Sequence, residues 1–374
     1  KFKVFRVTAG DGVGHADAFY HASGHFEMGG IEQNATWKCT FTRDSPPKLV
    51  RVEVRDYEEI LPNGNRSLRF VDQTANILGK EESYRGQLSL GIDHWRNRLQ
   101  GDFGVDVNGL QGLALGDANG DGFDDLYVCQ QGGLPNRLYL RQRDGTLTDH
   151  SETSGTDWME LTRAALFVDL DNDGDQDLAL AQGWYLMLME NDGQARFAKR
   201  LEKRADGQLH SLAAADYDND GDLDLYFCGR NPTREQTQSE GILGMPIPYH
   251  DANNGGPNVL LGNLGDWKFS DVTKAVGLDV NNRRYSYACS WEDYDNDGDQ
   301  DLYVANDFGR NNLFRNDVSG DGKFHDISAQ EGVEDISAGM SITWGDVNRD
   351  GRMDAYVSNM FSAAGNRIAY QRHF

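Results

Sequence analysis

The chain of 374 residues carries 60 Asp and Glu against 36 Lys and Arg, which gives a formal net charge of −24. This excess of acid provides no positive surface for the phosphates of a nucleic acid or for an anionic membrane, which argues against both partners. No apolar run approaches the roughly 20 residues of a membrane-spanning helix, so no membrane insertion is expected, and 43 glycines predict many tight turns rather than a helical bundle.

Residues 1–60 show no internal repeat. The segments 35–41 and 49–54 alternate apolar and polar side chains, as half-buried antiparallel strands do. We therefore expect a small β-rich element, which either closes the ring of a repeat domain formed by residues 61–374 or precedes it. His15, His21 and His25 lie close together here, but their spacing fits no standard metal motif, and we expect no metal site.

Residues 76–110, approximately, form a first insertion between a strand-like segment and the first of several repeated loops. Within it Leu88, Ile92, Trp95 and Leu99 fall on one face of a helix with the usual period. The pattern predicts a short amphipathic helix packed against the rim of the repeat domain.

Five segments repeat the pattern D-x-[DN]-x-D-G-x-x-D, beginning at Asp117, Asp169, Asp216, Asp293 and Asp346. Apolar, strand-like runs precede and follow each segment, so each is predicted to be a hairpin loop. The starts are 52, 47, 77 and 53 residues apart. A period near 50 residues with four short strands per unit indicates the blades of an all-β propeller.

Calcium chemistry explains the spacing of these acids. Ca²⁺ takes about 6 to 8 oxygen ligands, and a loop with oxygens at positions 1, 3, 5, 7 and 9 wraps them around one point, with Gly at position 6 for the sharp turn. Position 7 would use only its backbone carbonyl and leave its side chain free, which fits the Phe and Arg found there. The predicted ligands of up to five Ca²⁺ ions are Asp117, Asn119, Asp121, Phe123 and Asp125; Asp169, Asp171, Asp173, Asp175 and Asp177; Asp216, Asp218, Asp220, Asp222 and Asp224; Asp293, Asp295, Asp297, Asp299 and Asp301; and Asp346, Asn348, Asp350, Arg352 and Asp354.

An EF-hand shares the D-x-D-x-D-G start but needs a bidentate Glu at position 12 and flanking helices. Leu180 stands at position 12 of the second loop, and strands are predicted on both sides. The five loops hold 22 acids and two arginines, so they carry a charge of −20 out of the total of −24. The acidity of the chain therefore comes mostly from a set of ion sites.

Residues 231–257 account for the longest spacing and form a second insertion. Binding residues often lie on long loops over a rigid scaffold, although a plain surface excursion explains the segment equally well. The groups available here to a ligand, or as a base beside a charge-neutralising cation, are Tyr249, His250, Arg283, Arg284, Tyr285 and Arg310.

The four cysteines are predicted to be free and buried. Cys129 and Cys228 hold equivalent places in repeats that are two apart, which is too distant for a disulfide. Cys289 occupies a position that is apolar in the other repeats, and Cys39 lies in the N-terminal element. We expect four small hydrophobic thiols.

With these loops, and with NNLFRND from Asn311 and FSDVTKAVGL from Phe269, the chain resembles the FG-GAP or VCBS repeat proteins. Their calcium-binding β-propellers include the integrin α-subunit head and bacterial proteins similar to cartilage acidic protein. The resemblance covers residues 66–374, approximately, and implies an extracytoplasmic propeller of seven blades, occasionally six or eight, used for adhesion or ligand binding.

The sequence departs from that family in showing only five motif-bearing blades. The segment NRIAYQ near the C-terminus looks like the opening strand of another blade. Either the N-terminal element supplies the missing strands, or the chain is part of a longer chain or complex.

Three functions remain open. The first is a non-catalytic, calcium-stabilised propeller that presents loops to a protein or glycan partner. The second is a carbohydrate-active enzyme such as a polysaccharide lyase, and the third is a structural subunit of a larger assembly. The sequence contains no nucleophile elbow, phosphate loop or zinc signature, and we expect the first function.

Overall fold

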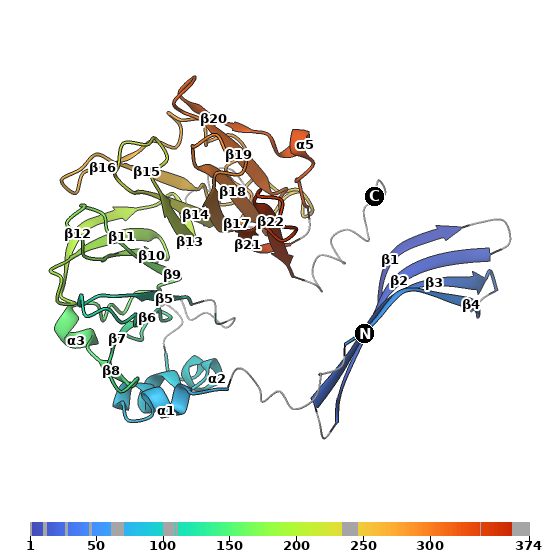
Figure 1. The fold of residues 1–374 in the computed structure, drawn as a ribbon, viewed down its shortest axis with the longest axis horizontal. Coiled ribbons are helices and arrows are strands. Elements are labelled where there is room, and N and C mark those ends of the chain that lie inside the picture. The colour runs from blue at the N-terminus through green and yellow to red at the C-terminus, as the bar shows by residue number, and fades with distance from the viewer. Residues whose placement is uncertain are drawn as a thin grey trace. The chain divides into compact units, whose positions relative to one another are not determined.

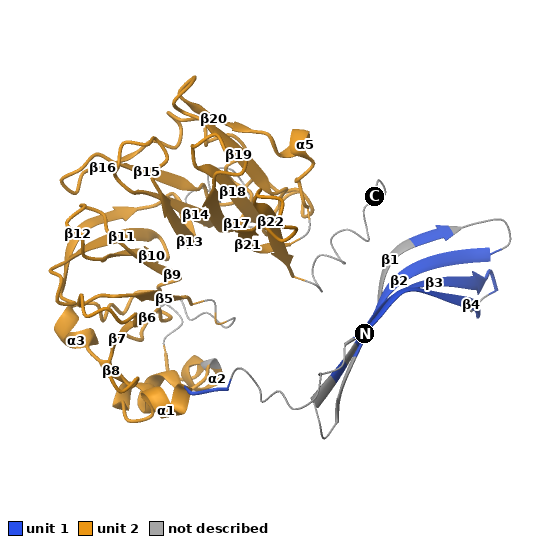
Figure 2. Ribbon diagram, in the orientation of Figure 1, with its two compact units in different colours: residues 1–73 blue, residues 74–374 orange. Residues whose placement is uncertain are grey.

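The computed structural model describes residues 2–9, 13–26, 29–44, 47–60, 71–99, 109, 111–233, 246–336 and 338–360. Within them the chain consists mainly of antiparallel β-sheets (Figure 1). It divides into two compact units, residues 1–73 and 74–374, which Figure 2 distinguishes by colour. Among the described residues we find no helix with the length and apolar character that a membrane crossing requires.

Unit 1 is a four-stranded antiparallel sheet in the order β1–β2–β3–β4. Its strands are β1 (Phe2–Ala9), β2 (Val13–Phe26), β3 (Gly29–Thr42) and β4 (Leu49–Ile60). The predicted strands 35–41 and 49–54 lie in β3 and β4, which pair with each other. His15 contacts Thr40 on β3, whereas the side chain of His25 lies outside the described part.

Unit 2 contains five successive sheets of described strands, which we number 1 to 5. Sheet 1 holds β5 (Leu113–Gly116), β6 (Asp125–Val128), β7 (Arg137–Arg141) and β8 (Leu147–Asp149). Sheet 2 holds β9 (Ala164–Val168), β10 (Asp177–Gln182), β11 (Tyr185–Asn191) and β12 (Phe197–Arg204). Sheet 3 holds β13 (Gly207–Ala215), β14 (Asp224–Pro232), β15 (Val259–Asn263) and β16 (Phe269–Asp271). Sheet 4 holds β17 (Ser286–Glu292), β18 (Asp301–Asn306), β19 (Asn312–Asp317) and β20 (Lys323–Asp326), and sheet 5 holds β21 (Gly339–Gly345) and β22 (Asp354–Asn359). The short helices α3 (Ser151–Ser154) and α5 (Ser328–Glu331) follow sheets 1 and 4.

The five sheets follow one another in an arc, with their first strands on the inner side (Figure 1). These inner strands contact one another in the order β5, β9, β13, β17 and β21. An apolar core layer lies between each pair of neighbouring sheets. In β10, for example, Leu178 and Leu180 pack toward sheet 1, while Ala179 and Ala181 pack toward sheet 3, because successive side chains point to opposite faces. Sheets 1 to 4 each contain the four strands that were predicted for one sequence repeat.

The first insertion packs against sheet 1 but is not one continuous helix. It contains α1 (Thr74–Leu78), a π-helical turn (Tyr84–Leu88) and α2 (Ile92–Arg96). The prediction of a single helix through Leu88, Ile92, Trp95 and Leu99 is therefore wrong. Gly91, just before α2, has an extended backbone with ψ of 171°, which interrupts the helical period. Parts of both insertions, and the NRIAYQ segment, lie outside the described residues.

All four cysteines lie in the described part of the chain and are free. Cys129 and Cys228 are buried, but Cys39 and Cys289 are partly exposed, so the expectation of buried thiols is wrong for those two. Cys228 and Cys289 belong to the core between sheets 3 and 4, where the neighbouring Cys228 thiol raises the pKa of Cys289 well above its ordinary value.

Candidate metal centres

The five acidic segments connect the first and second strands of the five sheets, which confirms that they are hairpin loops. We number them loops 1 to 5 after their sheets. In each loop the Gly at position 6 has a φ between 84° and 96°, a left-handed conformation that side chains disfavour. The glycine of the motif is therefore required by the turn itself.

The Asp at position 1 closes each loop by accepting backbone N–H groups. In loop 3 the two carboxylate oxygens of Asp216 accept the N–H groups of Asp220 (3.0 Å) and Gly221 (2.9 Å). Asp220 in turn accepts the N–H of Asp222 (2.9 Å). Loops 1, 4 and 5 repeat all three bonds. These bonds hold the loop in a curved conformation with its carboxylates on the inside.

Position 9 is an Asp that begins the second strand. Asp224 is only 1% exposed, and its two oxygens accept the N–H groups of Tyr217 in its own loop (3.1 Å) and Asn263 at the end of β15 (2.8 Å). Equivalent pairs of bonds are made by Asp125, Asp177 and Asp301. This side chain therefore ties the loop to its sheet, a role that the motif spacing did not reveal.

The electrostatic environment of position 9 disfavours an isolated negative charge. Burial, and to a smaller extent the other acids of the same loop, raise the pKa of Asp177, Asp224 and Asp301 to about 7. A cation in the loop would favour the ionised carboxylate, because an opposite charge at short range lowers the pKa of an acid.

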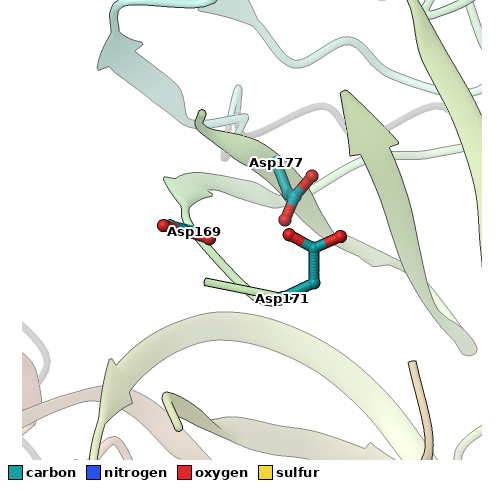
Figure 3. Close-up of side chains that lie close together, drawn as sticks. All are labelled: Asp169, Asp171 and Asp177. Carbon is teal, nitrogen blue, oxygen red and sulfur yellow. The ribbon is translucent and has the colours of Figure 1, made fainter. Parts of the chain in front are cut away.

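Loops 2, 3 and 4 each bring three carboxylates together. In loop 2, oxygens of Asp169, Asp171 and Asp177 lie within 4.8 Å of one another, and Figure 3 shows the Asp171 and Asp177 carboxylates turned toward each other. The same three positions, 1, 3 and 9, come together in loop 3 as Asp216, Asp218 and Asp224, whereas loop 4 gathers positions 1, 3 and 5, which are Asp293, Asp295 and Asp297. Within the described chain no such group of three acids forms in loops 1 and 5, where position 3 is Asn119 or Asn348.

The donor set of these loops suits a hard divalent cation. Every side-chain donor is a carboxylate or amide oxygen, and the five loops contain no His or Cys, which favours Ca²⁺ over the softer transition metals. In loop 2, Oδ1 of Asp169 is buried and accepts no hydrogen bond, so it retains lone pairs for an ion. The residues of loops 2, 3 and 4 therefore fit a Ca²⁺ ion.

Position 4 contributes contacts that the sequence alone did not suggest. This position has a positive φ in all five loops, at Gly120, Asn172, Asn219, Asn296 and Arg349. Asn172 donates to Oδ1 of Asp222 (2.6 Å), and Asn219 donates to Oδ1 of Asp299 (2.7 Å). The position 7 side chains of Asp222 and Asp299, which we expected an ion to leave free, are each hydrogen-bonded to the preceding loop.

A second set of asparagines joins neighbouring sheets. Asn263 ends β15, and its Nδ2 donates to the carbonyl of Leu170 in loop 2 (2.8 Å) and to that of Leu223 in its own loop (3.2 Å). Asn191 and Asn316 make the equivalent bonds to their own and the preceding loops. The signal in the sequence is an Asn at the end of the third strand of sheets 2, 3 and 4.

Of the arginines expected near the second insertion, Arg310 and Arg284 form ion pairs and Arg283 is hydrogen-bonded to the backbone. Arg310 Nε contacts Oδ2 of Asp251 (3.1 Å), and its Nη1 contacts Oε2 of Glu334 (2.8 Å). Arg284 lies 3.9 Å from the same Asp251, and Arg283 Nε donates to the carbonyl of Gly255 (2.9 Å). These contacts attach the insertion to the loops of sheet 4.

The other groups expected at that place are less concentrated. Tyr249 is 50% exposed and its ring lies 5.2 Å from that of Phe308. Tyr285 is 1% exposed and packs against the same Phe308, so it is not accessible to a large ligand. Among the contacts of the described residues, none joins the imidazole of His250 to the arginines.

Loops 2, 3 and 4 are expected to bind Ca²⁺ more tightly than loops 1 and 5, because affinity in such loops rises with the number of ligand charges. A calcium titration followed by native mass spectrometry should show three ions bound before any further ones. Asn348→Asp should tighten the binding of one of the late ions, whereas Asp218→Asn should remove one of the early three. Late ions that are unaffected by Asn348→Asp would mean that charge count does not set the order.

Comparison with known proteins agrees with this geometry. A family model of the FG-GAP-like repeat matches residues 117–180, 169–227 and 293–357, which begin at loops 1, 2 and 4. Cartilage acidic protein 1 of Xenopus tropicalis is 24% identical over 267 residues, covering 66% of this chain. The chain spans 40% of the length of that relative.

Two solved structures show weaker similarity. One is an Agrocybe aegerita lectin that recognises non-reducing terminal N-acetylglucosamine. Its TM-score is 0.39 and its sequence identity is 16%, and the match covers 65% of this chain and 60% of the lectin chain. The V. cholerae biofilm matrix protein Bap1 has a TM-score of 0.25 and 11% identity over 71% of this chain and 37% of its own. Similarity at this level does not bear on function. The repeated loops and the two sequence matches show that the chain carries FG-GAP-like repeats and is a distant homologue of cartilage acidic protein 1.

Proposed function

We propose that residues 74–374 form a calcium-stabilised β-propeller that acts outside the cytoplasm as a non-catalytic binding or adhesion module for a protein or glycan partner. The observation that carries the proposal is the recurrence of one loop, suited to a cation, at the first hairpin of five consecutive sheets. In this proposal each sheet is one blade of a propeller. The family resemblance implies that the ring has seven blades.

The packing of unit 2 supports the propeller. Each core layer lies between two sheets, so no sheet can bury its apolar faces without its neighbours. The inner strands contact one another in sequence, as they would around a central axis. Calcium would then hold the first hairpin of each blade in its curved conformation.

An extracytoplasmic location fits the loop chemistry. Calcium loops in extracellular modules commonly have dissociation constants of about 10⁻⁴ to 10⁻³ M, a range that only external calcium would fill. Loops with an Asn at position 3 belong to this weaker class in the present proposal. The protein could also be a subunit of a larger assembly and still act as a binding module, because a binding module can also be a scaffold.

The alternative of a polysaccharide lyase requires a base beside a cation that is available to a uronate carboxylate. Near the second insertion, Arg310 and Arg284 are instead committed to Asp251 and Glu334. We therefore expect no unsaturated uronate product, detectable by its ultraviolet absorbance, when the protein is incubated with alginate, hyaluronan or pectate. A product that forms with the wild-type chain and is lost in His250→Ala would show that the protein is an enzyme.

A further inference from the structure

The helical insertion and sheet 1 line two adjoining surface cavities that are open to solvent. The larger has a volume of about 530 Å³, and its lining includes Glu82, Ser83, Arg137 and Asp149. The smaller, of about 160 Å³, is lined by three further glutamines, Gln111, Gln130 and Gln131. Gln87, Trp95 and Leu134 line both cavities. The combined space falls in the range of about 300 to 1,000 Å³ that is typical of small-molecule sites.

The wall shared by the two cavities is held in place by hydrogen bonds. Gln87 is 5% exposed; its Oε1 accepts two bonds from the Arg137 guanidinium (2.9 and 2.6 Å), and its Nε2 donates to the carbonyl of Pro135 (2.8 Å). Ser83 is hydrogen-bonded to the hydroxyl of Tyr139 on β7 (2.8 Å). The insertion is therefore fixed on sheet 1, and the site is built before a ligand arrives.

Two amide groups at the smaller cavity have unused hydrogen-bonding capacity. Gln131 is 5% exposed, and its Oε1 accepts no hydrogen bond. Nε2 of Gln111 is likewise buried and donates none. A buried polar atom without a partner costs free energy, which a ligand group recovers when it binds. One acceptor and one donor in the same cavity match a hydroxyl group, since a hydroxyl both donates and accepts.

Trp95 supplies the apolar surface of the site. Its indole Nε1 donates to the carbonyl of Gln87 (3.3 Å), which holds the ring in position, while the rest of the partly exposed side chain lines both cavities. An aromatic ring combined with nearby amides suits a ligand that has an apolar face and polar edges. A sugar ring has that character, with C–H groups on its face and hydroxyls around its edge.

The charges around the cavities favour a neutral ligand. The guanidinium of Arg137 is paired with Asp149 (3.2 Å) and with Gln87, and Glu82 adds a negative charge. Among the lining residues that the structure describes, Arg137 is the only cation. A uronate or sulfate group would therefore meet no unmatched positive charge here.

We propose that these cavities bind a neutral sugar unit, with Trp95 against its face and Gln111 and Gln131 at its hydroxyls. This inference rests on the proposed function and gives it a site distinct from the second insertion. It names neutral glycans as the ligand class.

A glycan array that contains neutral, uronate-bearing and sulfated oligosaccharides tests the ligand class. The strongest hit is then titrated calorimetrically in calcium against the wild type, Trp95→Ala and Gln131→Met, a replacement of similar shape without an amide. We expect a neutral glycan, and a loss of affinity of at least about tenfold in both variants. Tyr249→Ala, an exposed aromatic in the second insertion, is the matched control and should bind as the wild type does.

The possible outcomes separate this inference from the proposed function. Binding that is unchanged in both site variants but weakened in Tyr249→Ala would overturn the site and leave a glycan-binding module. Binding only to acidic glycans would overturn the neutral class. An array with no binding would overturn the inference, while a protein partner would still satisfy the proposed function. Melting curves check that Gln131→Met remains folded, so that lost affinity reports on the amide.

Discussion

Removal of calcium should lower the midpoint of thermal unfolding by on the order of 10 °C or more. An ion that binds only the folded chain stabilises it by roughly 2.7 kcal/mol at 100 times its dissociation constant. Loops 2, 3 and 4 each gather three carboxylates, so three such contributions are lost together. Without ions the like charges in each loop also repel one another.

The measurement is differential scanning calorimetry in millimolar CaCl₂ and in excess EGTA. Addition of calcium to the EGTA sample should restore the higher midpoint. Mg²⁺ at the same concentration should restore less of it, because Mg²⁺ prefers a small octahedral shell with several waters. A midpoint that is the same in calcium and in EGTA would contradict the stabilising role of the loops.

The Asp at position 9 should be the most sensitive single residue of a loop. Asp224→Ala leaves the buried N–H groups of Tyr217 and Asn263 without an acceptor. Each such group costs about 1 to 3 kcal/mol, so the free energy of unfolding should fall by roughly 2 to 6 kcal/mol. Asp224→Asn keeps one acceptor oxygen and should lie between the wild type and the alanine variant.

Urea unfolding in EGTA and in calcium measures both terms of this prediction. The loss in EGTA reports the two hydrogen bonds, and the additional loss in calcium reports the missing ligand. Asp279→Ala, at an exposed position outside the loops, is the control and should change stability by less than about 0.5 kcal/mol. If Asp224→Ala behaved like that control, position 9 would not tie the loop to the sheet.

The loops could be predicted from the sequence because their chemistry is local. Calcium needs oxygens at fixed intervals along a single turn, so Asp169, Asp171 and Asp177 appear within nine residues. The strands on both sides follow from the apolar runs that flank each loop. Local sequence patterns were therefore sufficient to predict the repeat, the hairpins and the carboxylate clusters.

The contacts between sheets could not be predicted from local sequence patterns. Asn263 and its partner Leu170 are 93 residues apart, and only the stacking of sheets 2 and 3 brings them together. The bond from Asn172 to Asp222 spans 50 residues. The sequence likewise did not show which cysteines are neighbours. Repeat equivalence suggested a comparison of Cys228 with Cys129, whereas the packing of sheets 3 and 4 places Cys228 beside Cys289.

The helix predicted in the first insertion was wrong for a local reason. Leu88, Ile92, Trp95 and Leu99 keep the period of one helix, but the period does not show that the backbone leaves the helical conformation at Gly91. The consequence reaches the candidate sugar site, because this break separates the π-helical turn that carries Gln87 from the helix that carries Trp95. Both side chains then line the same cavities.

Anomalous scattering from crystals grown in millimolar calcium tests the central claim most directly. The account predicts peaks in loops 2, 3 and 4 and weaker peaks or none in loops 1 and 5. Each peak should lie within coordination distance of the clustered carboxylates, which are those at positions 1, 3 and 9 in loops 2 and 3 and at positions 1, 3 and 5 in loop 4. Data collected at two wavelengths would separate calcium from other ions. Five well-ordered loops without a peak at millimolar calcium would contradict the account, because the carboxylate clusters would then be turns of the fold and nothing more.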